Sequence, residues 1–241
     1  MVESILSLKG ITKHFGGVTA LKDVSFEVRA NEIVGLMGPN GAGKTTLLNI
    51  VAGEFSPDLG TINFKGHNIT GHAAYKSSKL GIARTYQIPQ PFVTLSVKEN
   101  LRVAAVFGKK SGSSGPSPNF DTILEMTGLA DKKETLAGDL PILALKKLEL
   151  ARALACDPDL LLMDEVAAGL TDIEIPKTLS TIKAIRDTGK TIILVEHVMK
   201  VMVNAVDRIV VLDKGMILCQ GTTQEVMNDC KVIEAYFGIE K

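Results

Sequence analysis

Residues 38–45 are Gly38-Pro39-Asn40-Gly41-Ala42-Gly43-Lys44-Thr45, which satisfies the pattern G-x-x-x-x-G-K-[ST]. A nearly continuous apolar run, 31–37, precedes them and is typical of a buried strand in a parallel sheet. A helix is predicted from about residue 45 to 51, and Gly53 closes it. A strand, a glycine-rich turn and a helix in this order predict a phosphate-binding loop in an α/β fold; the alternative is a glycine-rich turn that matches by chance.

Each part of this loop has a chemical purpose. Glycines let backbone N–H groups curl around phosphate oxygens without Cβ clashes, and the helix N-terminus adds a partial positive charge. Lys44 would place a cation on the β- and γ-phosphates, and Thr45 would offer its hydroxyl to Mg²⁺. The predicted nucleotide-binding residues of this loop are Gly38, Pro39, Asn40, Gly41, Ala42, Gly43, Lys44, Thr45 and Thr46.

Two carboxylates, Asp164 and Glu165, follow the apolar run 160–163, which predicts another buried strand. An aspartate at such a strand end is the second element that holds Mg²⁺ beside nucleotide phosphates. Glu165 comes one residue later, where the sheet opens, and a carboxylate there can orient or deprotonate an attacking water. The alternative is a solvated strand-end pair.

His197 follows a third apolar strand, 192–195. Ligands gather at the carboxyl ends of strands in open α/β sheets, so we expect His197 at the same sheet edge as Lys44 and Asp164. An imidazole there could bond a γ-phosphate oxygen. The alternative is a structural histidine.

Buried strands and helices alternate along the chain, which predicts an α/β fold with a mostly parallel sheet and antiparallel strands at both ends. We expect a single domain over 1–241, with a core of about 1–87 and 156–241 and a helical subdomain of about 88–155. Segment 108–118 is rich in Gly, Ser, Pro and Lys and predicts a loop or flexible connector. Further helices are predicted at about 97–107, 120–127, 140–155, 176–187, 198–205 and 224–237.

The composition narrows the function. The chain has 241 residues with 27 Lys and Arg against 27 Asp and Glu, which argues against a nucleic-acid binder held by bulk charge. Its three cysteines, Cys156, Cys219 and Cys230, are too few and too widely spaced for a disulfide scaffold, and we expect small buried hydrophobic residues. We find no apolar run long enough to span a membrane and no secretory signal. We therefore expect the chain to reside in a reducing cytoplasm.

Taken together, these residues resemble the ATP-binding subunit of ABC transporters over nearly the whole chain. The resemblance implies a P-loop NTPase with a mostly parallel core sheet, an antiparallel β subdomain and a helical subdomain. It also implies an ATPase whose cofactors are ATP and Mg²⁺. Phe15 is similar to the aromatic residue that stacks on adenine, and Gln87 to the glutamine that reaches Mg²⁺ and senses the membrane partner.

The resemblance also implies roles for the strand-end residues. It makes Glu165, His197 and Gln87 catalytic, as the family's catalytic glutamate, switch histidine and loop glutamine. It makes Thr45, Gln87 and Asp164 the residues that hold the metal.

The stretches 81–87, 97–101, 164–170 and 195–199 resemble the Liv-type ATPases of branched-chain amino-acid importers. This implies import of branched-chain amino acids or related polar solutes, at the cytoplasmic face of the membrane. The implied partners are transmembrane permease subunits, a second ATP-binding subunit or a copy of this chain, and indirectly an extracytoplasmic solute-binding protein, with no nucleic acid. A soluble ABC-type ATPase without a transporter, for example in iron–sulfur cluster assembly, is the alternative.

The chain departs from the family at two places. The family signature is close to Leu-Ser-Gly-Gly-Gln, and here the aligned stretch is Leu140-Pro141-Ile142-Leu143-Ala144. In the family this Ser and these Gly amides grip the γ-phosphate bound by the opposite subunit, and Pro141 has neither a hydroxyl nor an N–H. Pro favours a helix start, so we expect the helix to survive without those contacts. Thr171 stands where many members place Asp. We therefore hypothesise that this chain hydrolyses ATP against the intact signature of a partner.

Overall fold

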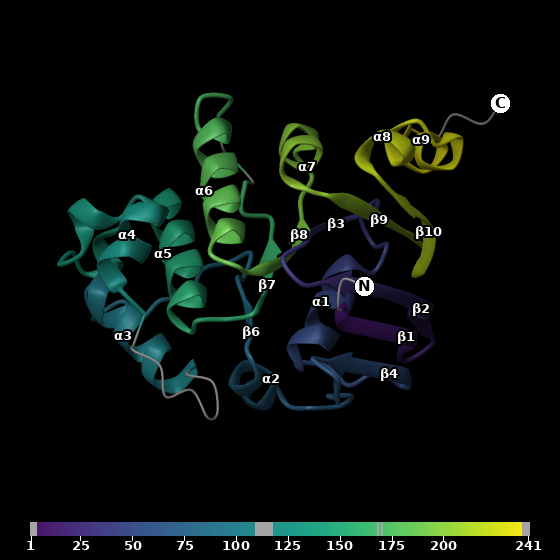
Figure 1. The fold of residues 1–241 in the computed structure, drawn as a ribbon, viewed down its shortest axis with the longest axis horizontal. Coiled ribbons are helices and arrows are strands. Elements are labelled where there is room, and N and C mark those ends of the chain that lie inside the picture. Colours follow the sequence, from purple (N-terminus) through teal and green to yellow (C-terminus); the bar gives the residue numbers. More distant parts are fainter. Residues whose placement is uncertain (1–3, 109–117, 168, 170, 238–241) are drawn as a thin grey trace.

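A six-stranded sheet runs through the molecule in the computed structural model, which describes residues 4–108, 118–167, 169 and 171–237 (Figure 1). Its order is β10-β9-β3-β8-β7-β6. The strands are β3 (Ile33–Met37), β6 (Ile82–Arg84), β7 (Leu160–Asp164), β8 (Thr191–Val195), β9 (Arg208–Asp213) and β10 (Met216–Gly221). All neighbours pair in parallel except β10, which is antiparallel to β9. The predicted mostly parallel sheet is confirmed.

A second sheet of four strands is antiparallel and has the order β2-β1-β4-β5. The strands are β1 (Ser4–Phe15), β2 (Val18–Arg29), β4 (Leu59–Phe64) and β5 (His67–Asn68). Alternating burial along β2, with Val24, Phe26 and Val28 inside, shows that one face of this sheet packs on the core while the other meets solvent.

Helix α1 (Lys44–Ala52) lies between the two sheets and gives the six-stranded sheet a different core on each face. Val34 and Leu36 of β3 pack with α1 and the antiparallel sheet. Ile33 and Met37 of the same strand face the opposite way, into a core shared with the other helices. This alternation is the period-2 pattern of a strand buried on both faces, which explains the unbroken apolar run.

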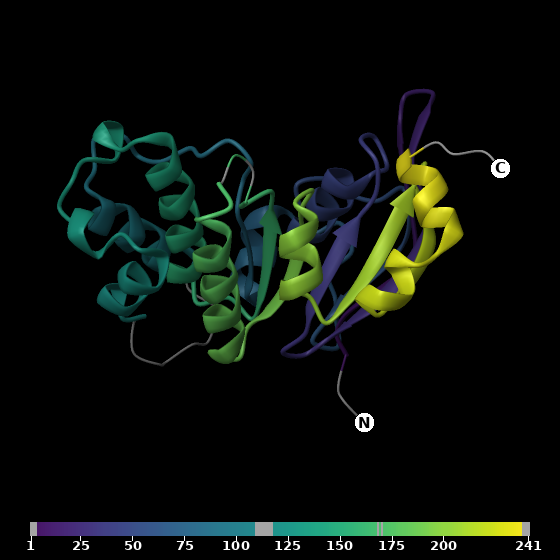
Figure 2. The ribbon, with the colours of Figure 1, turned by 90° about the horizontal axis from the view of Figure 1, so that it is seen from above.

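Of the remaining helices, the one over Ala74–Leu80 lies beside α1, and the others cover the opposite face and one end of the sheet (Figures 1 and 2). The remaining helices are α2 (Ala74–Leu80), α3 (Val97–Gly108), α4 (Phe120–Thr127), α5 (Ile142–Ala155), α6 (Ile175–Asp187), α7 (Met199–Ala205), α8 (Thr223–Met227) and α9 (Cys230–Phe237), with 3-10 turns at Ala130–Lys132 and Ala137–Asp139. Helices α3, α4 and α5 pack together beyond the β6 edge. The boundaries proposed for a helical subdomain at 88 and 155 stay a prediction.

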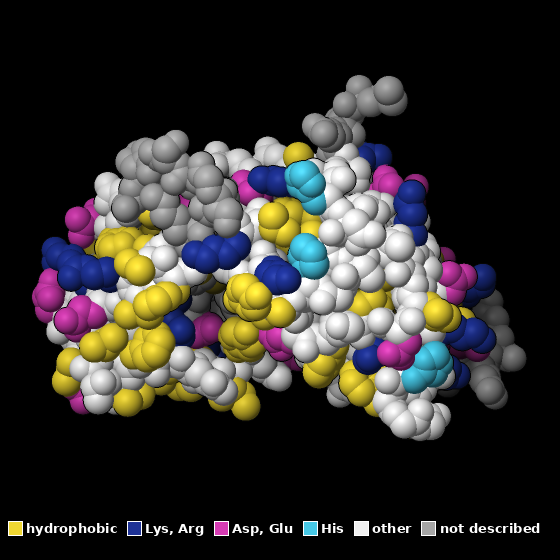
Figure 3. Space-filling model, turned by 90° about the horizontal axis from the view of Figure 1, so that it is seen from below, with side chains coloured by type: hydrophobic (Ala, Val, Ile, Leu, Met, Phe, Trp, Pro, Cys, Tyr) yellow, Lys and Arg dark blue, Asp and Glu magenta, His cyan; other side chains and the backbone are white. Residues whose placement is uncertain are grey.

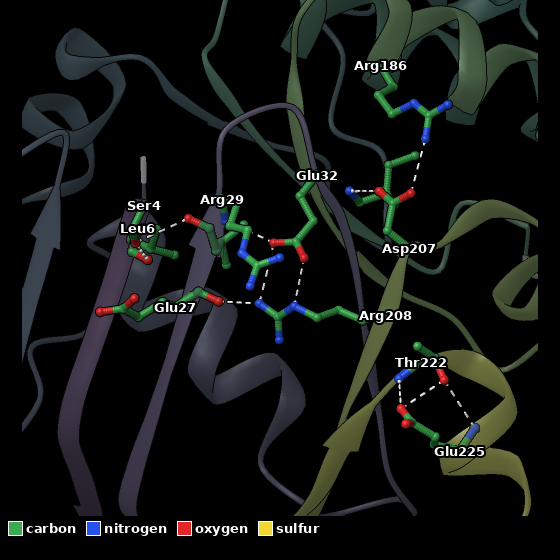
Figure 4. Close-up of polar contacts among 12 residues, drawn as sticks. Ser4, Leu6, Glu27, Arg29, Glu32, Arg186, Asp207, Arg208, Thr222 and Glu225 are labelled. Carbon is green, nitrogen blue, oxygen red and sulfur yellow. Dashed lines mark hydrogen bonds and ion pairs between the residues drawn. The ribbon is translucent and has the colours of Figure 1, made fainter. Parts of the chain in front are cut away.

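An ion pair between a buried glutamate and a half-buried arginine fastens the edge of the six-stranded sheet where its parallel strands begin. Glu32, directly before β3, pairs with Arg208 at 2.7 Å and accepts the Arg29 N–H at 2.8 Å (Figure 4). The Arg208 guanidinium also donates to the Glu27 carbonyl of β2. This contact ties the two sheets together at the edge opposite to the loop 38–43.

Several local predictions need correction. The closing helix predicted over 224–237 is two helices, because Asn228 caps the end of α8 and the Asp229 carboxylate accepts the Lys231 N–H at the start of α9. The helix predicted from 140 begins at Ile142, with Pro141 in extended conformation as its N-cap. The sequence pattern predicts neither helix α2 nor strand β6.

The cysteine prediction is wrong for Cys230, which is exposed, while Cys156 and Cys219 are half-buried; all three are free thiols. Of the predicted connector 108–118, the residues 109–117 lie outside the described residues. None of the described helices combines the length and apolar character that crossing a bilayer requires.

Candidate functional site

The loop between β3 and α1 takes a shape that only glycine allows at its first position. Gly38 has a φ of 148°, and a Cβ there would lie 2.1 Å from the Leu212 carbonyl oxygen of β9. Gly43, with a φ of 102°, lies against the β2 backbone, where a Cβ would come 2.7 Å from the Ala20 carbonyl oxygen. The loop therefore packs tightly between β9 and β2, and this packing fixes the directions of its backbone N–H groups.

Lys44 begins α1 and is buried, with its Nζ donating to the carbonyls of Gly38 at 2.7 Å and Pro39 at 3.0 Å. The ammonium is thus folded over the loop that precedes it. Burial lowers the pKa of Lys44, whereas the charges of Glu165 and Asp164 act to raise it. Thr45 is exposed at the helix start and Thr46 is half-buried. A cation, a helix N-terminus and a hydroxyl therefore converge where phosphate oxygens can approach.

Asp164, the last residue of β7, is buried and pairs with Arg84 at the end of β6, with 3.2 Å between Oδ2 and the guanidinium nitrogen. The backbone N–H of Asp164 donates to the Thr85 hydroxyl at 3.1 Å. Burial raises the pKa of Asp164, and the nearby Arg84 opposes that shift. Hard carboxylate oxygens next to a phosphate-binding loop suit Mg²⁺ carried on a nucleotide.

The Glu165 side chain contacts the two other predicted catalytic residues. One carboxylate oxygen accepts the Gln87 amide N–H at 2.6 Å, and the other lies 3.3 Å from His197 Nε2. Gln87 and His197 are exposed. The parallel register places Asp164 beside Val195, so the ends of β7 and β8 coincide and deliver these side chains to one edge.

Phe15 ends β1 and is 43% exposed. Its ring packs edge-on against Phe55 at 5.3 Å between centroids, and Lys13 Nζ lies 5.5 Å from the ring centre. Strand β2 lies against the phosphate-binding loop at Gly43, and Gly215 bridges the two, because Lys22 donates to the Gly215 carbonyl and Gly215 donates to the Ala42 carbonyl. Phe15 thus offers a partly open aromatic face from the strand that pairs with β2.

Sequence reasoning missed two buried residues at this edge. Arg84 bonds not only Asp164 but also Asn49 of α1 and, at 3.3 Å, Glu54, so it joins the loop's helix to the Asp164 carboxylate. Glu196, between β8 and His197, is buried and accepts the Ala167 N–H at 2.6 Å. The available signal was their position, since each ends or directly follows a parallel strand.

The segment aligned with the family signature begins α5. Pro141 is its N-cap and makes no side-chain hydrogen bond to the helix, and Ile142 is 60% exposed. Thr171 donates from both its N–H and its hydroxyl to Glu174 at 2.8 Å, which closes the turn before α6. An apolar side chain therefore stands at the start of α5, where the resemblance to the family signature predicts a glycine.

A family model described as "ABC transporter" matches residues 21–168, more than half of the chain. The chain is also 36% identical over 253 residues to the high-affinity branched-chain amino acid transport ATP-binding protein LivG of Salmonella typhimurium, and the match covers 99% of each protein. It belongs to the ABC transporter family. A probable LivG of Archaeoglobus fulgidus is 34% identical over 98% of this ABC ATPase and 96% of that protein.

Solved structures agree with this assignment. The crystal structure of the ADP conformation of MJ1267, an ATP-binding cassette of an ABC transporter, superposes with a TM-score of 0.86 at 30% identity and covers 98% of this ABC ATPase and 100% of that chain. A nucleotide-free ATP-binding cassette from an ABC transporter gives 0.85 at 29% identity, over 99% and 100%. The predicted fold class and ATPase activity are confirmed, and the relatives' names do not favour the transporter-independent alternative.

Proposed function

We propose that this ABC ATPase hydrolyses MgATP with Glu165 as the residue that activates water. The observation that carries the proposal is the Glu165 carboxylate, bonded to Gln87 and His197 at the sheet edge where Lys44 and the phosphate-binding loop lie. A positioned carboxylate of this kind accelerates proton transfer by about 10²–10⁴-fold.

The other residues bind and orient MgATP. The N–H groups of 38–46 and the Lys44 ammonium hold the β- and γ-phosphates, and Phe15 stacks on adenine. Thr45, Asp164 and Gln87 hold the Mg²⁺ that accompanies the nucleotide. His197 bonds a γ-phosphate oxygen. Support for these roles comes from the convergence of Lys44, Asp164 and Glu165, whose charges act on one another.

The energy of this reaction drives a membrane importer for branched-chain amino acids or related polar solutes. The names of the relatives support this cargo, since both LivG proteins are described as branched-chain amino acid transport ATP-binding proteins. The chain works at the cytoplasmic face of the membrane beneath transmembrane permease subunits, which an extracytoplasmic solute-binding protein supplies.

The permease docks on an aromatic groove beside Gln87. This groove has a volume of about 600 Å³ and lies between α2, α3 and α5. Tyr75, Tyr86, Phe92 and Phe107 line it, and all four are exposed. Hydrophobic side chains gather on this face of the molecule (Figure 3). Exposed apolar surface of this kind favours a protein partner.

A second ATP-binding subunit with an intact signature completes the site at Lys44. The start of α5 supports a heterodimer, because Pro141 lacks the donor and Ile142 adds bulk that a phosphate grip would exclude. The site that α5 faces in the partner would then turn over slowly. Strongly cooperative MgATP hydrolysis by this chain alone would contradict the heterodimer.

The catalytic role is tested in the transporter complex, purified from the membranes of the native cells through an affinity tag on this chain. Glu165→Gln should lower phosphate release at least about a hundredfold while MgATP affinity is retained. Glu125→Gln, on the exposed face of α4, is the matched control and should behave as wild type. Undiminished phosphate release from the Glu165→Gln complex would refute the role.

A further inference from the structure

Glu196 is a buried carboxyl group that the proposed reaction does not use. It directly follows β8, precedes His197, and is 2% exposed. Its Oε1 accepts the N–H of Ala167 at 2.6 Å. Ala167 lies two residues after Glu165, so this bond fastens the loop that carries the proposed water-activating carboxylate.

That loop leaves β7 in an unfavourable backbone conformation. Glu165 has a φ of 50°, in the left-handed region that a glutamate rarely adopts. The surrounding contacts must stabilise such a conformation for it to persist. Two bonds to the end of β8 do so: the Glu165 N–H donates to the Val195 carbonyl at 2.9 Å, and the Ala167 N–H donates to the Glu196 side chain.

The two bonds flank the residue whose orientation matters. With its backbone fastened on both sides, Glu165 points its carboxylate at His197, 3.3 Å away. His197 is the chain neighbour of Glu196, so one strand end supplies both the side chain that fixes the loop and the imidazole that the loop's carboxylate faces. Releasing Ala167 would leave the orientation of Glu165 to the Val195 bond and to side-chain contacts with exposed residues.

Burial and the charges of neighbouring groups act on the pKa of Glu196. Burial raises the pKa of Glu196 to about 7, and the negative charge of Glu165 acts in the same direction. The backbone N–H groups of Ala167 and His197 and the positive charge of Lys146, on α5, oppose the shift. The Ala167 bond needs only an acceptor oxygen, which the ionised and the protonated carboxyl both supply. A glutamine at this position would supply it too.

We propose that Glu196 is a positioning residue for ATP hydrolysis, which acts through the Ala167 N–H to hold Glu165 toward His197 and the γ-phosphate. This inference rests on the proposed role of Glu165. The two glutamates at this edge of the sheet then have different roles. Glu165 contacts the reacting water, and Glu196 fixes the backbone from which Glu165 projects.

The test compares Glu196→Gln, which keeps the acceptor, with Glu196→Leu, which removes it. Glu32→Leu is the matched control, since Glu32 is also a buried carboxylate in the same sheet but bonds Arg208 at the opposite edge (Figure 4). Three quantities are measured: MgATP affinity of the full chain, the NMR resonance of the His197 ring in the full chain, and phosphate release by the complex isolated from membranes. Glu165→Ala gives the His197 resonance without its carboxylate neighbour.

We expect Glu196→Leu to lower phosphate release about tenfold to a hundredfold, because a misplaced reacting group costs this much, with MgATP affinity within about threefold of wild type. Its His197 resonance should move toward that of Glu165→Ala. Glu196→Gln should restore both phosphate release and resonance. Glu32→Leu should lower stability and leave the His197 resonance unchanged.

Two results would overturn the proposal. One is a Glu196→Leu chain with wild-type phosphate release and a wild-type His197 resonance. The other is equal impairment of Glu196→Gln and Glu196→Leu, which would show that the acceptor oxygen is not what matters. Failure of the wild-type chain to bind MgATP would instead defeat the proposed function, while the His197 resonances would still report the position of Glu165.

Discussion

The Lys44 ammonium bonds two carbonyls of its own loop, Gly38 and Pro39, at 2.7 and 3.0 Å. Phosphate oxygens would be stronger partners for a buried ammonium than neutral carbonyls, because both groups are then charged. Lys44→Ala should therefore weaken MgATP binding about tenfold to a hundredfold, the worth of one charged hydrogen bond. Isothermal titration calorimetry measures this, with Lys9→Ala on the exposed side of β1 as control. Equal affinities of the two variants would contradict the role of Lys44.

A second single residue, Glu196, should make the free energy of unfolding depend on pH. Burial raises its pKa from 4.5 to about 7, so the folded chain holds this proton more tightly than the unfolded chain. The resulting stability is complete below about pH 4.5 and is lost as the pH rises to about 7. Between pH 5 and 8, the free energy of unfolding of wild type should therefore fall relative to Glu196→Gln, by up to about 3 kcal/mol. Urea denaturation at each pH measures it, and a constant difference would contradict the assignment.

At the scale of elements, contact with β9 determines the conformation of the loop 38–43 as much as its own glycines do. A Cβ on Gly38 would lie 2.1 Å from the Leu212 carbonyl, so the loop or the strand must move. Gly38→Ala should weaken MgATP binding at least about tenfold and lower the melting temperature by several degrees. Gly17→Ala, in the β1–β2 turn where a Cβ meets nothing within 4 Å, should change neither. A wild-type affinity for Gly38→Ala would show that the loop tolerates displacement.

Elements with an unbroken apolar run or a clear hydrophobic period could be predicted from the sequence, and those with neither could not. Strands β7 and β8 and the loop before α1 follow from local pattern, and parallel strands bring Glu165 and His197 to one edge. Helix α2 has a polar sequence in which only Ser77 is buried, so it carries no helical period. Strand β6 has three residues and exists only through its pairing with β7. The Arg84–Asp164 pair joins residues 80 positions apart, which no local pattern records.

At the scale of the whole molecule, the proposed function assigns two unequal halves of an ATP site to this chain. The proposed phosphate-binding edge carries Lys44, Asp164 and Glu165, whereas the start of α5 carries Pro141 and Ile142, which would grip a phosphate poorly. Two copies of this chain would pair each complete edge with a defective one. We therefore propose that a different ATP-binding subunit lies opposite Lys44.

Light scattering on the Glu165→Gln chain, with and without MgATP, tests this claim most directly. Without the carboxylate, bound ATP should persist, so any dimer that ATP can close would accumulate. We expect the chain to bind MgATP and to keep its monomer mass of 25.8 kDa. A mass that doubles only when MgATP is added would contradict it, because α5 of one copy would then complete the Lys44 site of the other.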